Sequence, residues 1–186
     1  MEGKMGGMKR KADAGGRERP PIQDFVDAVE KAGAKKAKVV DTKSVVTAPW
    51  VRMKCQYGCG GFRSSLCCPP FTPTPEEMRK VIDSYDKAIL FEAGRREAKK
   101  IAVTAEREIF LSGYYKAFGL GSGPCHCCGD KDCAFEKGCR HPYEARPSME
   151  SCGIDVYATV RGNGFEIEVV RDEKDVQRYF GLILVE

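Results

Sequence analysis

Apolar residues at helical spacing predict four helices, and β-branched runs predict five short strands. The helices are expected over residues 22–29, 75–85, 97–118 and 148–161. The strands are expected over residues 37–41, 44–47, 88–91, 165–170 and 180–185. Helices and strands follow one another without a regular repeat. We therefore expect a single compact α+β domain, with a sheet of four or five strands and helices packed on it.

Two of these helices carry additional signals. Thr74 is suited to be an N-cap, with Pro75 as the first helical residue and Glu77 as the acid of a capping box. The helix over residues 97–118 has one apolar face of mainly alanine and isoleucine. Its charged positions are expected to face mostly outward: Arg96, Lys99, Lys100, Glu106 and Arg107.

The composition fits one folded domain with a short basic extension. The chain has 186 residues, of which 42% are hydrophobic and 31% charged. Of the net charge of +4, the first twenty residues carry +3. Residues 1–20 are therefore expected to be a flexible basic tail and residues 21–186 the domain. The longest apolar run, residues 180–185, is too short to span a membrane, and we expect a cytoplasmic protein.

Nucleic acid is not an expected partner. The domain is close to neutral and so lacks the charge of a phosphate-tracking surface. Tyr114, Tyr115 and Phe118 would suit a stacking platform for single strands. We favour a packing role for them, at the core-facing end of the long helix.

The ten cysteines dominate the chemistry of the chain. In a protein of this size without secretory features, clustered thiols favour metal binding or catalysis over disulfides. The first group reads Cys55-x3-Cys59-x7-Cys67-Cys68, with glycines that let the backbone fold around a small centre. The second contains Cys125-His126-Cys127-Cys128, followed by Cys133 and Cys139.

Adjacent cysteines point their side chains apart, so each adjacent pair is expected to supply one ligand to a given centre. Choosing Cys128 over Cys127 leaves a complete four-thiolate set, consisting of Cys125, Cys128, Cys133 and Cys139. Choosing Cys68 over Cys67 leaves three thiolates in the first group, Cys55, Cys59 and Cys68. That group would be completed by Cys67, by a remote residue or by an exogenous ligand.

The ligand pattern favours an iron–sulfur cluster, with zinc as the alternative. Dense thiolates, glycines and a proline after the last cysteines are typical of cluster ligation, although the spacing does not match a bacterial ferredoxin. Structural zinc prefers paired two-thiolate knuckles, and only Cys125-x2-Cys128 is of that form. A redox dithiol is a third interpretation, although such motifs usually lack companion thiols.

The residues around the two groups have simpler interpretations. Cys152 lies on an apolar stripe with Met149 and is expected to pack as a small hydrophobe. His126 and His141 are expected to be loop residues or hydrogen-bond donors to sulfur. Two arginines beside the second group would either offset thiolate charge or pair with Glu144 and Glu150; they are Arg140 and Arg146.

Four strings of the sequence resemble the prokaryotic family of predicted metal-binding proteins called domain of unknown function 2284. They are MKCQYGCGG, LCCPPFTPTPEEMRKVIDSYDKAIL, EREIFLSGYYKAFGLGSGPC and CRHPYEARPSMESCGIDV. The resemblance runs from about residue 35 to the end. It implies a cytoplasmic protein that binds metal through cysteines. The positions that match the family's motifs are Cys55, Cys59, Cys68, Cys125, Cys128, Cys133 and Cys139.

These observations lead to one functional expectation with two rivals. We expect a [4Fe–4S] protein that acts in electron transfer, with a redox partner protein, or in cluster-dependent chemistry. A second centre on the first cysteine group is part of this hypothesis. The rivals are a zinc-stabilised binding module without a reaction of its own and a thiol-based oxidoreductase. Neither a substrate nor an oligomeric state is readable from local motifs.

Overall fold

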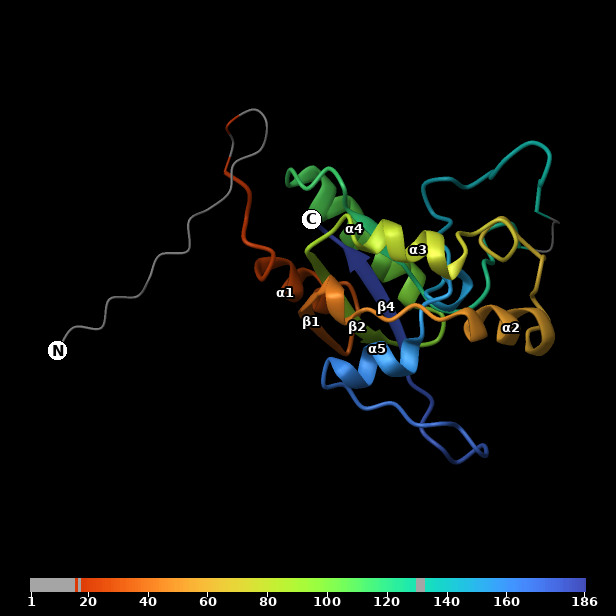
Figure 1. Cartoon of the computed structure of the whole chain (residues 1–186). Coiled ribbons are helices and arrows are strands. Elements are labelled where there is room, and N and C mark those ends of the chain that lie inside the picture. Colours follow the sequence, from red (N-terminus) through yellow and green to blue (C-terminus); the bar gives the residue numbers. More distant parts are fainter. Residues whose placement is uncertain (1–15, 17, 130–132) are drawn as a thin grey trace.

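A four-stranded antiparallel sheet forms the centre of the computed structural model, which describes residues 16, 18–129 and 133–186 (Figure 1). The strands lie in the order β1-β2-β4-β3. Their bounds are Lys36–Asp41 for β1, Lys87–Ala93 for β2, Phe118–Leu120 for β3 and Tyr179–Leu184 for β4. The last strand along the chain therefore lies inside the sheet, between β2 and β3. The expected α+β class is confirmed.

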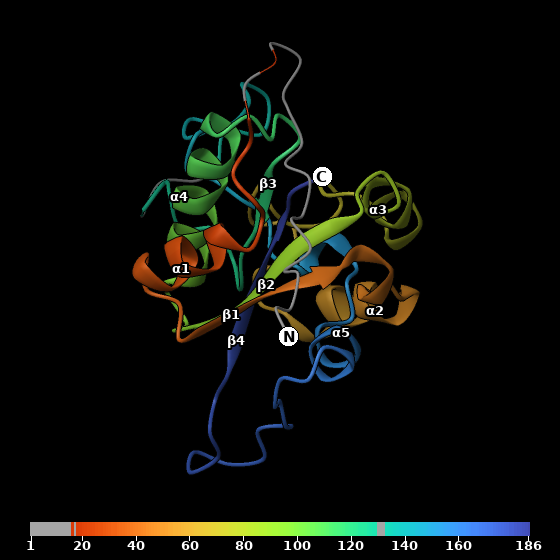
Figure 2. The same cartoon turned by 90° about the vertical axis from the view of Figure 1, so that its left-hand side faces the viewer.

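Helices cover both faces of this sheet (Figure 2). Alternate residues of a strand point to opposite faces, and the two central strands are buried on both. Ile89 and Ile183 pack against α1 (Asp24–Lys31) and α4 (Ala98–Leu111). Leu90 and Leu182 face the other core, which includes residues of α3 (Pro75–Ile82) and α5 (Val156–Gly162).

The predicted capping box of α3 is confirmed, whereas the long helix is shorter than expected. The Thr74 hydroxyl accepts from the Glu77 amide at 3.2 Å, and the Glu77 carboxylate accepts from the Thr74 amide at 2.8 Å. The helix expected to reach residue 118 ends at Leu111, and Gly113 follows in the left-handed region at φ 98°. Residues 112–117 form turns instead, and Phe118 begins β3, which pairs with β4.

Three other predicted elements were wrong in whole or in part. Residues 44–47 form no strand: Thr42–Ser44 is a 3-10 turn, η1, and Thr47 makes an isolated bridge. Residues 165–170 are irregular. Phe165 and Ile167 are buried against the core, but this segment pairs with none of the four strands of the described chain. The helix over 148–161 is divided into the turn η2 (Glu150–Cys152) and α5.

A helix that the pattern did not predict carries the first cysteines. This helix, α2, covers Pro49–Gly58 and begins after Ala48 in extended backbone, with Pro49 in its first turn. Val51 is its only buried residue. Because α2 packs on η2 rather than on the sheet, it lacks the broad apolar stripe that reveals a helix from sequence.

The ends of the domain close against one another. Most of the expected tail, residues 1–15 and 17, lies outside the described residues. Arg19 contacts Glu186 at 3.1 Å and lies over the Tyr114 ring, whose hydroxyl donates to the Pro20 carbonyl at 2.6 Å. Tyr114 is buried as expected, while Tyr115 and Phe118 are exposed. None of the helices in the described part of the chain is long and apolar enough to cross a membrane.

Candidate metal centre

The first cysteine group begins on α2 and continues into the following turns. Cys55 lies in the last turns of the helix, and its sulfur donates to the Glu150 carbonyl of η2 at 3.8 Å. Cys59 is the C-cap residue. Cys68 is buried, and its sulfur accepts from the Ser65 hydroxyl at 3.3 Å. The first group is therefore held partly by a helix and not by a loop alone.

The second group lies on the irregular segment between β3 and η2. Its turns include Gly129 and Gly138, both at positive φ, where a side chain would be strained. The sulfur of Cys139 accepts from the His141 amide at 3.4 Å. His141 also lies beside Glu144, with Nδ1 4.0 Å from its carboxylate. The donor to sulfur is thus the backbone amide of residue 141, so the predicted role of the imidazole itself stays a prediction.

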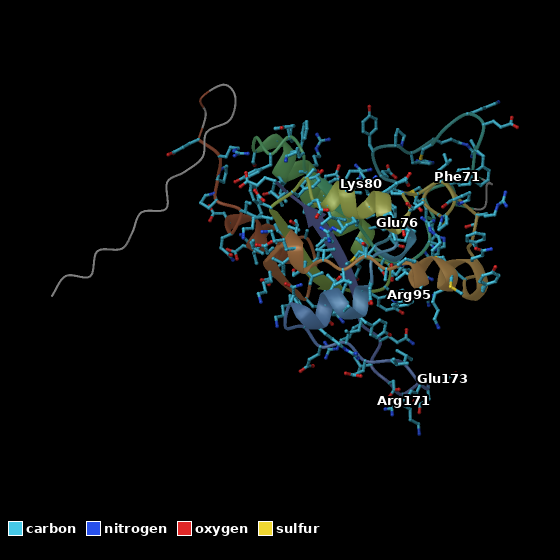
Figure 3. The ribbon with its side chains drawn as sticks, in the orientation of Figure 1. Phe71, Glu76, Lys80, Arg95, Arg171 and Glu173 are labelled. Atoms are coloured by element: carbon cyan, nitrogen blue, oxygen red, sulfur yellow. The ribbon has the colours of Figure 1, made fainter. Side chains whose placement is uncertain are left out.

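Two contacts join the cysteine-bearing segments directly. The Leu66 amide donates to the Cys133 sulfur at 3.4 Å. The Phe71 and Phe135 rings pack with their centroids 5.0 Å apart. Figure 3 shows Phe71 at this end of the molecule, away from Arg171 and Glu173 on the loop before β4. Segments more than sixty residues apart in sequence are therefore neighbours.

Together the two segments line one hollow of about 370 Å³. Its walls include glycines 60 and 61 and serines 64 and 65 from the first segment, and His126 from the second. The thiols on its lining are Cys67, Cys125, Cys127, Cys128, Cys133 and Cys139. All four members of the predicted four-thiolate set are thus at the same hollow. Cys127, which the interpretation set aside, is there as well.

The adjacent cysteines 67 and 68 serve different sides of this region. Cys67 lies beside Cys125, and hydrogen bonding between the two thiols lowers the pKa of Cys125 and raises the pKa of Cys67. Burial raises the pKa of Cys55, and the charges of Cys59 and Cys68 raise it further. Cys68 is therefore near the first group, while Cys67 faces the second.

Over the residues that the structure describes, no three Cys, His, Asp or Glu side chains come close enough to enclose a metal ion. Residues 130–132, between Cys128 and Cys133, are outside that range. The chemistry of the site nevertheless fits a thiolate-bound metal. Soft sulfur ligands select zinc, copper(I) or iron–sulfur clusters, and amide donors to sulfur, as at Cys133 and Cys139, stabilise thiolates. The specific ligand set stays a prediction.

Arg146 binds neither of the glutamates that the sequence suggested. Its guanidinium makes two bonds of 2.6 Å to the Glu106 carboxylate on α4. It also donates to the Pro142 and Ala145 carbonyls. This pair connects the end of the second cysteine segment to α4. Hydrogen bonding to Glu106 raises the pKa of Arg146, and the thiols of Cys67 and Cys139 add to that effect.

Two charged residues that the helical pattern placed outside are directed inward. Glu106 is one, and its side chain is 15% exposed. Lys99 is the other, because its ammonium group is buried near the thiols. The sequence feature that could have indicated this orientation is the pair of glycines at positions 119 and 121. Side chains at these positions would collide with α4. Close approach of this kind shows which side of the helix faces the protein.

Cys152 packs in the core as expected. It is 1% exposed among residues such as Met149 and Ile154, and burial raises its pKa to about 11. Its thiol is not part of the hollow lining.

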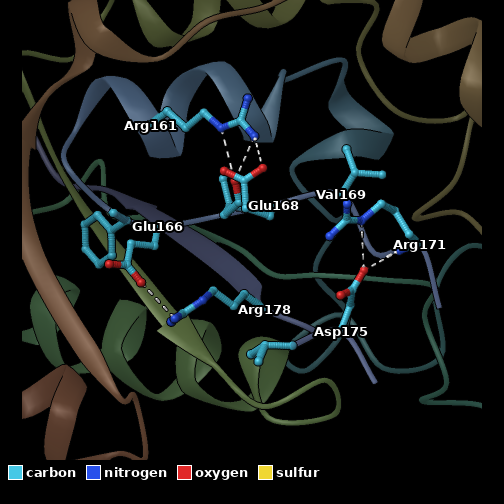
Figure 4. Close-up of a pocket in the computed structure, with 10 residues that line it drawn as sticks. Arg161, Glu166, Glu168, Val169, Arg171, Asp175 and Arg178 are labelled. Carbon is cyan, nitrogen blue, oxygen red and sulfur yellow. Dashed lines mark hydrogen bonds and ion pairs between the residues drawn. The ribbon is translucent and has the colours of Figure 1, made fainter. Parts of the chain in front are cut away.

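A second and larger hollow, of about 530 Å³, lies between α5 and the segment before β4 (Figure 4). Its three arginines are all paired with carboxylates. Arg161 contacts Glu168 at 3.1 Å, and Arg171 contacts Asp175 at 3.3 Å. Arg178 contacts Glu166 and Glu92. Because these charges neutralise one another and no cysteine lines the hollow, it is a weaker candidate than the thiol-lined one.

The comparison with known proteins agrees with the thiol-rich site. No curated protein and no solved structure matches the chain. The family model described as "Predicted metal-binding protein (DUF2284)" matches residues 38–185, a range that contains all ten cysteines. The chain therefore belongs to the DUF2284 family of predicted metal-binding proteins.

Proposed function

We propose that this protein holds a [4Fe–4S] cluster on Cys125, Cys128, Cys133 and Cys139. The observation that carries the proposal is that these four thiols line one hollow, with Cys67 beside Cys125. Such a cluster supplies one-electron transfer at a potential set by its surroundings. The amides of Leu66 and His141 donate to two of these sulfurs and support this assignment.

A redox partner protein and a cytoplasmic location are part of the proposal. Cytosolic conditions keep free thiols reduced. Large side chains exposed on α2, beside the first cysteines, support protein contact at this end of the molecule; they are Trp50, Met53 and Tyr57. Cys55, Cys59 and Cys68 form the proposed second site, whose remaining ligand is open.

The test is the metal content of protein purified anaerobically without added metal. We expect a brown protein with matching amounts of iron and acid-labile sulfide. Cys133→Ser should lower both. Cys152→Ala, which removes a thiol from the core instead of the hollow, should retain both.

Two outcomes would contradict the proposal. Stoichiometric zinc in a colourless protein would identify a zinc-stabilised module. A metal-free protein that catalyses thiol–disulfide exchange, and that loses this turnover when a single cysteine is replaced, would be a thiol oxidoreductase.

A further inference from the structure

Lys99 has a buried ammonium group on the same face of α4 as Glu106. It lies on α4 beside Ala98 and Ala102, both fully buried. Within the described part of the chain, its Nζ atom has no hydrogen-bond partner. Burying an unpaired ammonium costs several kcal/mol unless a nearby charge offsets it. Negative charge close to this point would offset that cost.

The groups that act on this charge are mainly cysteine sulfurs. Burial lowers the pKa of Lys99 overall, and the charges of Cys125, Cys67, Cys68 and Cys127 offset part of that effect, Cys125 most strongly. These residues come from both cysteine groups. The Glu150 carboxyl, itself buried, also interacts with Lys99.

The course of the lysine side chain depends on Gly121. A Cβ atom added to Gly121 would lie 2.4 Å from the Cγ of Lys99 and 3.0 Å from its Cα. The backbone of Gly121 is itself fixed, because its amide donates to the Pro147 carbonyl at 2.9 Å and its carbonyl accepts from the Met149 amide at 3.1 Å. The absence of a side chain at position 121 therefore leaves the space that the Lys99 stem occupies, at the start of the segment that leads to Cys125.

We propose that the Lys99 ammonium is the built-in countercharge of the metal–thiolate centre, directed to the Cys67–Cys125 pair across Gly121. The proposal rests on the metal-binding function proposed above, but not on the identity of the metal. Four thiolates carry more negative charge than a divalent ion offsets, so a fixed cation in a region of low dielectric constant stabilises the loaded site. In the metal-free protein, the same buried cation lowers the free energy of unfolding.

The experiment measures Zn²⁺ affinity by competition with a chelator, with Co²⁺ absorption as a second reading of thiolate coordination. Lys99→Met removes the buried charge. Lys100→Met, one residue along the same helix and exposed, is the matched control. We expect Lys99→Met to bind Zn²⁺ at least tenfold more weakly than Lys100→Met, which is about 1.4 kcal/mol. The metal-free Lys99→Met protein should melt at or above the wild-type temperature.

The outcomes separate this inference from the function on which it rests. If the wild-type protein binds neither ion, the countercharge proposal fails, whereas the iron and sulfide content of anaerobically purified protein decides the proposed function separately. If the wild type binds Zn²⁺ and the two variants bind equally well, the countercharge role of Lys99 is refuted. A Lys99→Met protein that does not fold, or melts well below wild type without metal, also refutes it, because the lysine would then serve the fold. Gly121→Ala should weaken Zn²⁺ binding in the same direction.

Discussion

Arg146→Met tests whether a partly buried ion pair holds the second cysteine segment to α4. The Arg146 and Glu106 side chains are 13% and 15% exposed. The substitution removes both guanidinium bonds and leaves the Glu106 carboxylate with the Gly119 amide, 2.8 Å away, as a remaining donor. The packing of the guanidinium over the Phe118 ring is also lost.

Removing one partner of a buried pair costs about 3–5 kcal/mol, since it strands the other charge. Partial exposure and the Gly119 donor place the expected cost at the lower end, about 3 kcal/mol. For a protein of this size, that corresponds to a fall in melting temperature of about 6–12 °C. Arg171→Met is the matched control. It breaks a pair whose arginine is 82% exposed, and it should cost less than about 1 kcal/mol.

The assay is thermal and urea unfolding of metal-free protein, so that a change in metal binding does not enter the result. A double variant, Glu106→Gln with Arg146→Met, should be more stable than Arg146→Met alone because it strands no charge. The reasoning is refuted if Arg146→Met is no more destabilising than Arg171→Met, or if the double variant is the least stable of the set.

Three further predictions concern the scaffold. Thr74→Ala should lower the free energy of unfolding by about 1 kcal/mol in urea titrations, because it removes the capping box of α3; an unchanged midpoint would contradict this. Gly181→Ala should cost about 1–3 kcal/mol, since the new Cβ would lie 2.3 Å from Phe91, whereas Gly162→Ala, in open space, should be close to neutral in the same titrations. Burial raises the pKa of Tyr85, so the unfolded chain loses this proton first and wild-type stability should fall as pH rises above about 10. Tyr85→Phe should lack this pH-dependent loss. If the difference in free energy of unfolding between wild type and Tyr85→Phe stays constant from about pH 9 to 11, the pKa of Tyr85 does not contribute as expected.

The elements that could be predicted are those whose signals are local. Thr74, Pro75 and Glu77 define the start of α3 by themselves, and the helix forms as expected. The segment at 165–170 shows the limit of such reasoning. Phe165 and Ile167 have the alternation of a strand and are buried like one, but a strand also needs a neighbour, and pairing is decided by the whole sheet.

The sequence indicated that cysteines form the candidate site, but not how they are arranged. Cysteine spacing indicated four of the thiols that line the hollow, but it set Cys127 aside and preferred Cys68 to Cys67, which lines the hollow. That Cys67 would face Cys125 depends on how two distant segments fold together. The inward direction of Lys99 and Glu106 was also hidden, because a long charged side chain gives the same pattern whether it reaches solvent or a buried partner.

The position of β4 inside the sheet has a consequence for synthesis on the ribosome. β2 and β3 have no common neighbour until residues 179–184 have emerged. Translation adds roughly 5–20 residues per second, so the cysteines of both groups leave the ribosome seconds before the sheet that supports them can close. During that interval the thiols are exposed to metal carriers and oxidants alike. The order of events in the cell, metal delivery before or after closure of β4, therefore decides whether the nascent chain needs protection.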